Sequence, residues 1–185
     1  MLWHIQQGDG PDLVLVHGWG MHAGIWGNLP HQLAAHFRVT PLDLPGHGRS
    51  HDVLCEPTLT AFTDAVVQAS PASAIWLGWS LGGLIALDAA RRYPDRVTKL
   101  VLVSATPKFV QAADWPHALE AEVFAGFAHS LAREYRATLL RFLSLQIGTD
   151  DSTRALLKTL RTQIFEYGEP RASALAGGLS ILQES

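Results

Sequence analysis

Short apolar runs alternate with helical patterns along the first 105 residues of the chain. Four runs are almost continuously hydrophobic and too short for helices: LVLV at 13–16, RVTPL at 38–42, AIWL at 74–77 and KLVLV at 99–103. Strands that are buried on both faces of a parallel sheet have this character. Helical patterns follow at 58–69, with Thr58 as N-cap, and at 80–93, ending before Pro94. The alternation predicts an α/β fold, a mostly parallel sheet flanked by helices.

After Ser104 the pattern becomes helical, and we expect no further strand from Pro107 to Ser185. Apolar residues fall on one face of each of two predicted helices: Val123, Phe124, Phe127 and Leu131 in the first, and Leu156, Leu157, Leu160 and Ile164 in the second. The residues GTDDS at 148–152 predict a turn between these helices. We therefore divide the chain into the N-terminal part of an α/β core at 1–105 and a helical cap at 106–185.

Composition and charge narrow the class of protein. The 185 residues are 48% hydrophobic and 17% charged, which is typical of one soluble domain or of one domain with an insertion. The net charge of -3 gives no general attraction to nucleic acid or to a membrane, and no apolar run approaches the ~20 residues of a membrane span. The N-terminus lacks the basic start and apolar core of a signal peptide, and the single Cys55 fits a reducing compartment. We expect a cytoplasmic protein, and we interpret Cys55 as a bystander.

The residues GWSLG at 78–82 match G-x-S-x-G, the pattern of a nucleophile elbow. In such an elbow a strained strand-to-helix turn pushes a serine hydroxyl out of the backbone, and glycines are needed beside it. The pattern alone also fits a glycine-rich turn with a serine at a helix N-cap. A buried strand before Ser80 and a helical pattern after it favour the elbow, with Ser80 as the nucleophile.

Two further loops follow predicted strands. HGWG at 17–20 comes directly after LVLV, and DLPGHGRS at 43–50 follows the next strand. A loop such as HGWG can direct a backbone N–H at a developing oxyanion, beside the N–H of the residue after the nucleophile. The donors would be the N–H groups of Trp19 and Leu81, and His17 is better suited to bracing the loop than to catalysis.

With these motifs in order, the chain resembles the α/β-hydrolase superfamily. The resemblance rests on LVLVHGWG, LDLPGHGRS, GWSLGG and the PDRV–LVLVSATP stretch. Because the elbow carries a serine, the dehalogenases and epoxide hydrolases with an aspartate nucleophile are excluded. HGWG, AIWLGWSLGGL, ADWP at 113–116, RFLSLQ at 141–146 and GGLSIL at 177–182 are similar to the pimeloyl-[acyl-carrier protein] methyl ester esterases of biotin biosynthesis, across the whole chain.

This resemblance implies a serine carboxylesterase that hydrolyses the methyl ester of pimeloyl-acyl-carrier protein through an acyl-enzyme on Ser80. It implies an oxyanion hole at Trp19 and Leu81 and no cofactor. It also implies that the substrate chain lies against Trp19 and the cap stretch Phe142, Leu143, Ser144, Leu145 and Gln146. The expected partner is an acyl-carrier protein.

A basic cap fits an acidic carrier protein. Between residues 130 and 165 there are six basic and three acidic side chains, a local +3 on a chain of -3. Such a face can steer a negatively charged partner and its phosphopantetheine. The resemblance matches Arg141 and Arg154 to docking positions. The alternative is a set of solvated helix faces.

The groups that would activate Ser80 are not in the sequence. The fold requires an acid and then a histidine after the serine, but the only later histidines are His117 and His129, both in the expected cap. We expect that the triad Asp and His are absent and that the chain is C-terminally truncated, without the last core strands. It is then a poor esterase whose exposed sheet edge favours self-association, whereas the full-length protein is a monomer.

Other functions stay open at this point. Another α/β-hydrolase activity, such as that of a lactonase or a C–C bond hydrolase, uses the same scaffold. A truncated inactive form could only bind the acyl chain or the carrier protein. The upstream histidines lack the spacing of metal ligands, so we expect no metal site.

Overall fold

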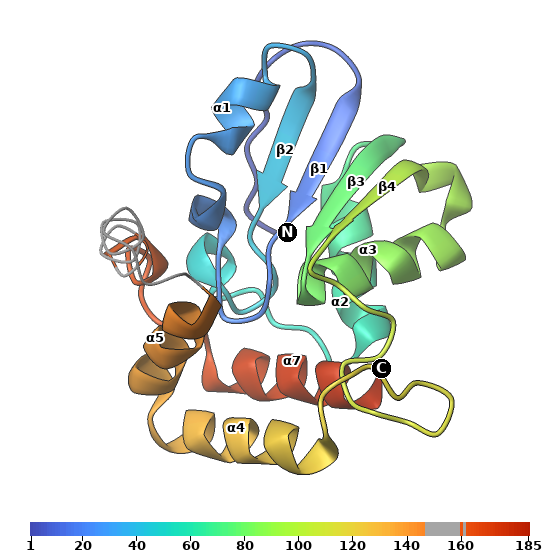
Figure 1. Cartoon of the computed structure of the whole chain (residues 1–185). Coiled ribbons are helices and arrows are strands. Elements are labelled where there is room, and N and C mark those ends of the chain that lie inside the picture. The colour runs from blue at the N-terminus through green and yellow to red at the C-terminus, as the bar shows by residue number, and fades with distance from the viewer. Residues whose placement is uncertain (147–159, 161) are drawn as a thin grey trace.

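The computed structural model describes residues 1–146, 160 and 162–185. Four parallel strands form one sheet in the order β2-β1-β3-β4 (Figure 1). Their bounds are Asp12–Val16 for β1, Arg38–Leu42 for β2, Ala74–Trp79 for β3 and Val97–Val103 for β4. All four predicted strands and the predicted α/β class are confirmed, and β3 and β4 are each two residues longer than their apolar runs.

Helices on the two faces of the sheet bury the apolar runs. Strand β1 lies between β2 and β3, and its Val14, Leu15 and Val16 are fully buried. On one face α2 (Leu59–Ala69) and α3 (Leu81–Arg92) cover a core that contains Val14, Val16 and Trp76. On the other face α1 (Leu29–Leu33) contributes to a smaller cluster with Leu13 and Leu15. Three 3₁₀ turns complete the first part: η1 (Ala23–Trp26), η2 (Gly48–Ser50) and η3 (Pro94–Arg96).

The predicted N-cap of α2 shows how local sequence starts an element. Thr58 has extended backbone angles, and its side chain accepts a hydrogen bond from the Ala61 N–H at 3.2 Å. This bond satisfies one of the amides that the first helical turn leaves without a partner. The helix therefore begins where the sequence predicted.

Strand β4 forms an edge of the sheet. Within the described part of the chain it pairs with β3 alone. Val101, Leu102 and Val103 remain 40–44% exposed, which is unusual for three successive apolar residues of a parallel strand. Self-association through this edge stays a prediction.

Residues after β4 form an irregular segment before the first cap helix. Residues 104–120 contain only isolated bridges, between Val110 and Leu119 and between Ala112 and Trp115. The sequence led us to expect helical structure from Pro107 onward. The difference has a physical reason, because Pro107 and Pro116 interrupt helical hydrogen bonding.

We call the described residues of 121–185 the cap. Its helices include α4 (Ala121–Arg133), α5 (Tyr135–Gln146) and α7 (Ala172–Glu184), and residues 160 and 162–164 are also helical. Figure 1 shows α7 between α4 and the end of the core at which the strands point. Phe124, Leu139 and Leu175 are buried in the same cluster as the core residues. Val123, expected on the buried face of α4, is 55% exposed. The predicted turn at 148–152, together with Leu156 and Leu157, lies outside the described residues.

Candidate active site

The turn at Ser80 has the geometry of an elbow. Ser80 joins β3 to α3 with φ 54° and ψ -120°, a region that non-glycine residues rarely occupy. Its backbone N–H donates to Val103 O at 3.0 Å, and its carbonyl accepts from the N–H of Gly83 at 2.8 Å. The Ser80 side chain makes no capping hydrogen bond to α3. The interpretation of Ser80 as an ordinary N-cap serine is therefore wrong.

The glycines of the elbow are required by close backbone approach. A Cβ at Gly78 would lie well under 3.0 Å from the backbone of Gly82, and a Cβ at Gly82 would lie equally close to Val16 O. Backbone atoms of a buried strand cannot move aside cheaply. The two glycines thus let α3 begin directly against the end of β1.

Replacing Gly82 with alanine should lower the free energy of unfolding by about 3 kcal/mol, because the new methyl group overlaps the backbone of β1. The matched control is Gly126→Ala in α4, where a Cβ meets no heavy atom within 4 Å. That change should raise stability by about 0.5–1 kcal/mol through helix propensity. Urea unfolding of both variants measures the difference, and equal effects would contradict the close approach at Gly82.

Ser80 lines a cavity of about 400 Å³ between the core and the cap. Among the described residues of its lining, Ser80 and Ser104 supply the side-chain hydroxyls, and the other side chains are aliphatic or aromatic. The lining residues are Gly18, Trp19, Trp79, Ser80, Ser104, Phe109, Leu119, Val123, Phe124, Phe127, Leu179 and Leu182. An apolar cavity of this size with a few polar groups suits a small ligand or an acyl chain.

The HGWG loop lies at the same cavity. Gly18 and Trp19 line it, and Leu81 is the first residue of α3, fully buried beside Ser80. The N–H groups of a first helical turn have no partner within the helix, so that of Leu81 is available to an oxyanion. The structure therefore brings Trp19, Ser80 and Leu81 together, and their catalytic roles stay predictions.

His17 holds the base of this loop. Its Nε2 accepts from the Leu44 N–H at 2.9 Å, so Nδ1 carries the hydrogen and donates to Gly18 O at 2.8 Å. Burial, followed by the neighbouring His47, lowers the pKa of His17 to about 3. A fully buried, neutral imidazole with both nitrogens engaged can brace the loop but cannot exchange protons with a ligand.

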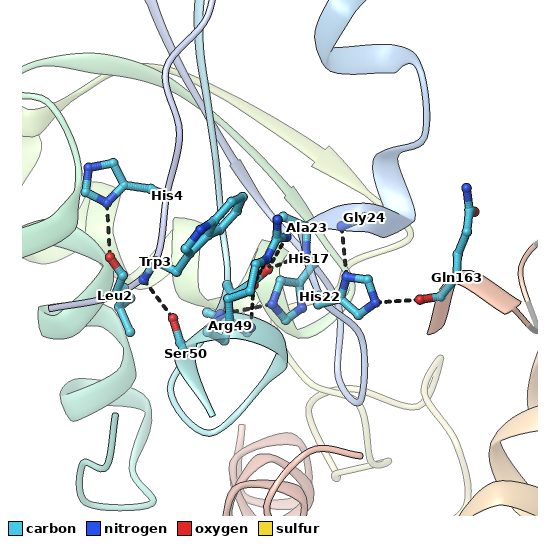
Figure 2. Close-up of polar contacts among 12 residues, drawn as sticks. Leu2, Trp3, His4, His17, His22, Ala23, Gly24, Arg49, Ser50 and Gln163 are labelled. Atoms are coloured by element: carbon cyan, nitrogen blue, oxygen red, sulfur yellow. Dashed lines mark hydrogen bonds and ion pairs between the residues drawn. The ribbon is translucent and has the colours of Figure 1, made fainter. Parts of the chain in front are cut away.

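A buried carboxylate that the sequence analysis missed, that of Asp43, lies on the other side of the loop. Figure 2 shows its hydrogen-bond partners Ala23 and Arg49. Asp43 accepts hydrogen bonds from the Ala23 N–H at 2.6 Å, from the Arg49 N–H at 2.8 Å and from Arg49 Nε at 2.8 Å. Burial alone would raise the pKa of Asp43, but the Arg49 guanidinium and the other donors lower it below its usual value. The Arg49 guanidinium also lies 3.1 Å from the Trp3 ring centroid and 4.3 Å from that of Tyr167. Asp43 is the first residue of the DLPGHGRS loop, so its position directly after a predicted strand was the sequence feature that could have indicated this role.

The predicted substrate stretch on α5 is described in part. Leu143 is buried in the main core cluster, and the Ser144 hydroxyl donates to Leu140 O at 2.7 Å. The side chains of Phe142, Leu145 and Gln146 lie outside the described part. The described cap side chains at the cavity come instead from α4 and α7. The sequence analysis placed Phe124 and Phe127 on an apolar helix face but did not assign them to a cavity. Leu179 and Leu182 belong to the GGLSIL stretch, which it used only for the family resemblance.

No histidine lines the described cavity, although the chain has nine. The His117 ring contacts the Trp115 ring at 6.0 Å, and His129 lies in a separate hollow. Within the described residues, no group of three or more His, Cys, Asp or Glu side chains could hold a metal ion. None of the described helices combines the length and apolarity that crossing a membrane requires.

The predicted docking arginine Arg141 is exposed at a polar hollow of about 200 Å³ between α4 and α5, which Arg133 and His129 share. Neither Arg141 nor Arg133 forms an ion pair with another described residue. Arg136, by contrast, pairs with Glu169 and lies over the Phe165 ring, which reduces the free charge of the cap. Arg154 lies outside the described residues.

Comparison with known proteins agrees with this geometry. Residues 11–174 match the alpha/beta hydrolase fold family. A pimeloyl-[acyl-carrier protein] methyl ester esterase from Xanthomonas campestris pv. campestris (strain B100) is 47% identical over 178 residues, which are 96% of this chain and 70% of that protein. The esterase of the same name from Nitrosomonas europaea is 42% identical over 183 residues, 98% of this chain and 72% of that protein.

Solved structures show the same fold. An esterase from Exiguobacterium antarcticum superposes with a TM-score of 0.86 at 19% identity, over 98% of this chain and 69% of that one. The enol-lactonase from Burkholderia xenovorans LB400 has a TM-score of 0.79 at 23% identity, over all of this chain and 70% of that one. From the family match, the relatives and the shared fold, the chain belongs to the alpha/beta hydrolase fold family, with the pimeloyl-[acyl-carrier protein] methyl ester esterases among its relatives.

Proposed function

We propose that this protein is a serine carboxylesterase that hydrolyses the methyl ester of pimeloyl-[acyl-carrier protein]. The observation that carries the proposal is Ser80, held in a strained elbow at an apolar cavity, in a chain 47% identical to an esterase of that name. The structural similarity to an enol-lactonase is no evidence for a lactone substrate, because at 23% identity it shows a shared fold and not a shared activity. A cytoplasmic location is part of this proposal, because the single Cys55 fits a reducing compartment.

The chemistry follows from the arrangement of the cavity. Ser80 Oγ would attack the ester carbonyl carbon while its proton passes to a base. The carbonyl oxygen then becomes an oxyanion, which the backbone N–H groups of Trp19 and Leu81 would bind. Trp19 lines the cavity with Ser80, and Leu81 follows Ser80 as the first residue of α3, which supports this role. Collapse of the intermediate expels methoxide, which takes up the proton and leaves as methanol. Water would hydrolyse the acyl-enzyme to the free carboxylate and regenerate Ser80.

Two parts of the substrate would bind at two places, the acyl chain in the cavity and the carrier protein on the cap surface. An apolar cavity of about 400 Å³ suits the methylene chain of a pimeloyl group. The carrier protein and its phosphopantetheine phosphate are anionic, so they would dock on unpaired arginines such as Arg141 and Arg133 at the polar hollow. Arg154 remains part of this docking proposal on the strength of the sequence alone.

The experiment measures Ser80-dependent loss of the methyl group from pimeloyl-carrier protein methyl ester by mass spectrometry. Arg141→Glu should weaken binding of the carrier-linked ester about tenfold, because it replaces an attraction by a repulsion. It should leave p-nitrophenyl butyrate hydrolysis unchanged. Lys99→Glu is the matched control, since Lys99 is exposed on β4 and carries the same charge away from the cap.

Equal losses for the carrier-linked and the small ester in Arg141→Glu would contradict docking at this hollow. Demethylation that continues in Ser80→Ala would contradict the proposed function itself.

A further inference from the structure

The loop that carries Trp19 is bonded to the cap at three points, through three different cap segments. The Trp19 indole N–H donates to Leu175 O of α7 at 2.9 Å. The Tyr135 hydroxyl of α5 donates to Gly20 O at 3.2 Å. His22 bonds Gln163 O at 2.7 Å (Figure 2). The loop donates two of these bonds, from Trp19 and His22, and accepts the third from Tyr135.

The donors in these contacts are fixed by their surroundings. His22 Nδ1 accepts from the Gly24 N–H at 3.0 Å, so Nε2 carries the hydrogen that is donated to Gln163 O. Burial, and then the Glu169 carboxylate, raises the pKa of Tyr135, so its hydroxyl stays protonated and can only donate to a carbonyl. In both contacts a side-chain N–H or O–H group therefore donates to a backbone carbonyl across the boundary between loop and cap.

Cap side chains pack against the same loop. Gly20 has φ +71°, and a Cβ there would contact Leu139, Leu175 and the Tyr135 hydroxyl at 3.7–3.9 Å. The Trp19 side chain is 6% exposed and meets the Phe127 ring edge-on at 6.1 Å. Gly178 of α7 lies flat against the Trp19 indole, because a Cβ there would come within 2.5 Å of Cδ1. The tip of the loop is thus inserted among cap side chains.

We propose that Tyr135 is a positioning residue. Together with the Trp19 indole and His22 contacts, its hydroxyl fastens the loop to the cap and so holds the backbone N–H of Trp19 in place for an oxyanion. This inference rests on the proposed function of Ser80. Its physical consequence is that the cap does more than enclose the substrate. The oxyanion donor reaches its working geometry only while the cap is docked, so cap docking and oxyanion binding are coupled.

Tyr135→Phe removes one hydroxyl and keeps the ring that contacts Phe165. Hydrogen–deuterium exchange of a peptide spanning residues 17–22 should become roughly three- to tenfold faster, because one of the bonds that close the loop is lost. In phosphonylation of Ser80 by a fluorophosphonate, the rate constant at saturating reagent should fall by a similar factor while the half-saturating concentration stays constant. A lower rate constant with an unchanged half-saturating concentration is expected when a positioning residue is lost. It is not expected when the lost residue only stabilises the fold.

Tyr167→Phe is the matched control, because Tyr167 is also a cap tyrosine near this loop but its hydroxyl bonds no described residue. A second variant, Gly178→Ala, pushes the Trp19 indole away from Leu175 O and should accelerate exchange of the same peptide. Unchanged exchange in Tyr135→Phe, or equal acceleration in Tyr167→Phe, would overturn the inference. Because no histidine lines the described cavity, phosphonylation is measured with added imidazole in every variant. If exchange changes as expected but Ser80 reacts in none of the proteins, the contact between loop and cap stands, whereas the oxyanion role and the proposed function both fail.

Discussion

Acidification from pH 6.5 to pH 4.5 should remove on the order of 5 kcal/mol from the free energy of unfolding, through the two buried histidines His17 and His47. Both are fully buried. Burial is the main cause that lowers the pKa of His17 to about 3 and that of His47 to about 4, from a usual value of 6.5. Because typical domains are stable by only about 5–15 kcal/mol, a loss of this size unfolds much of the population.

The direction follows from proton binding in the two states. Below pH 6.5 the unfolded chain protonates both imidazoles, whereas the folded chain keeps them neutral until about pH 4 for His47 and about pH 3 for His17. The unfolded state therefore binds more protons, and stability falls as the pH falls. Asp43 adds nothing in this window, because its pKa lies below 3.8 and its contribution is lost only at lower pH.

Urea unfolding at several pH values measures this slope. Between pH 5.5 and 4.5 stability should change by about 2.7 kcal/mol per pH unit, two histidines contributing about 1.36 each. His47→Gln should halve the slope, whatever it does to stability at neutral pH. His36→Gln is the control, since His36 is exposed in the folded protein and should leave the slope unchanged. A wild-type slope near zero would contradict neutral buried imidazoles.

The sheet could be predicted from the sequence because its signal is local. Continuous apolar runs and the helices between them depend on burial on both faces, and each run in the pattern became a strand. The elbow was predicted for the same reason, since two glycines flank Ser80 within five residues. Trp19 and Leu81 followed because they hold fixed positions beside these motifs.

The rest of the site depends on contacts between residues far apart in the chain. Asp43 receives its hydrogen bonds from Ala23 and Arg49, and Tyr135 reaches Gly20 across 115 residues. No periodicity or spacing encodes such pairs. The apolar face of α4 was recognised as core, but the sequence could not show that the same face lines the cavity, because that depends on how the cap sits on the sheet.

Hydrolysis of p-nitrophenyl acetate by the purified 185-residue protein should be slow, and added imidazole should accelerate it. A serine without its base loses on the order of 10⁴–10⁶ in kcat, while oxyanion donors and binding still supply some catalysis. None of the histidines lines the described cavity, and His17, the nearest in sequence to the oxyanion loop, has both nitrogens engaged. The described protein thus offers Ser80 no imidazole.

Free imidazole can supply the missing proton acceptor, because its pKa lies near neutrality and the cavity of about 400 Å³ has room for it beside a short ester. We expect at least a tenfold increase in the Ser80-dependent rate that saturates with imidazole concentration. Imidazole also hydrolyses activated esters in solution, so the same titration on Ser80→Ala is subtracted. Fast hydrolysis without imidazole that Ser80→Ala abolishes would show that the protein has a base of its own. An identical increase in Ser80→Ala would contradict Ser80 as the nucleophile, since the added imidazole would then act on the ester without the Ser80 hydroxyl.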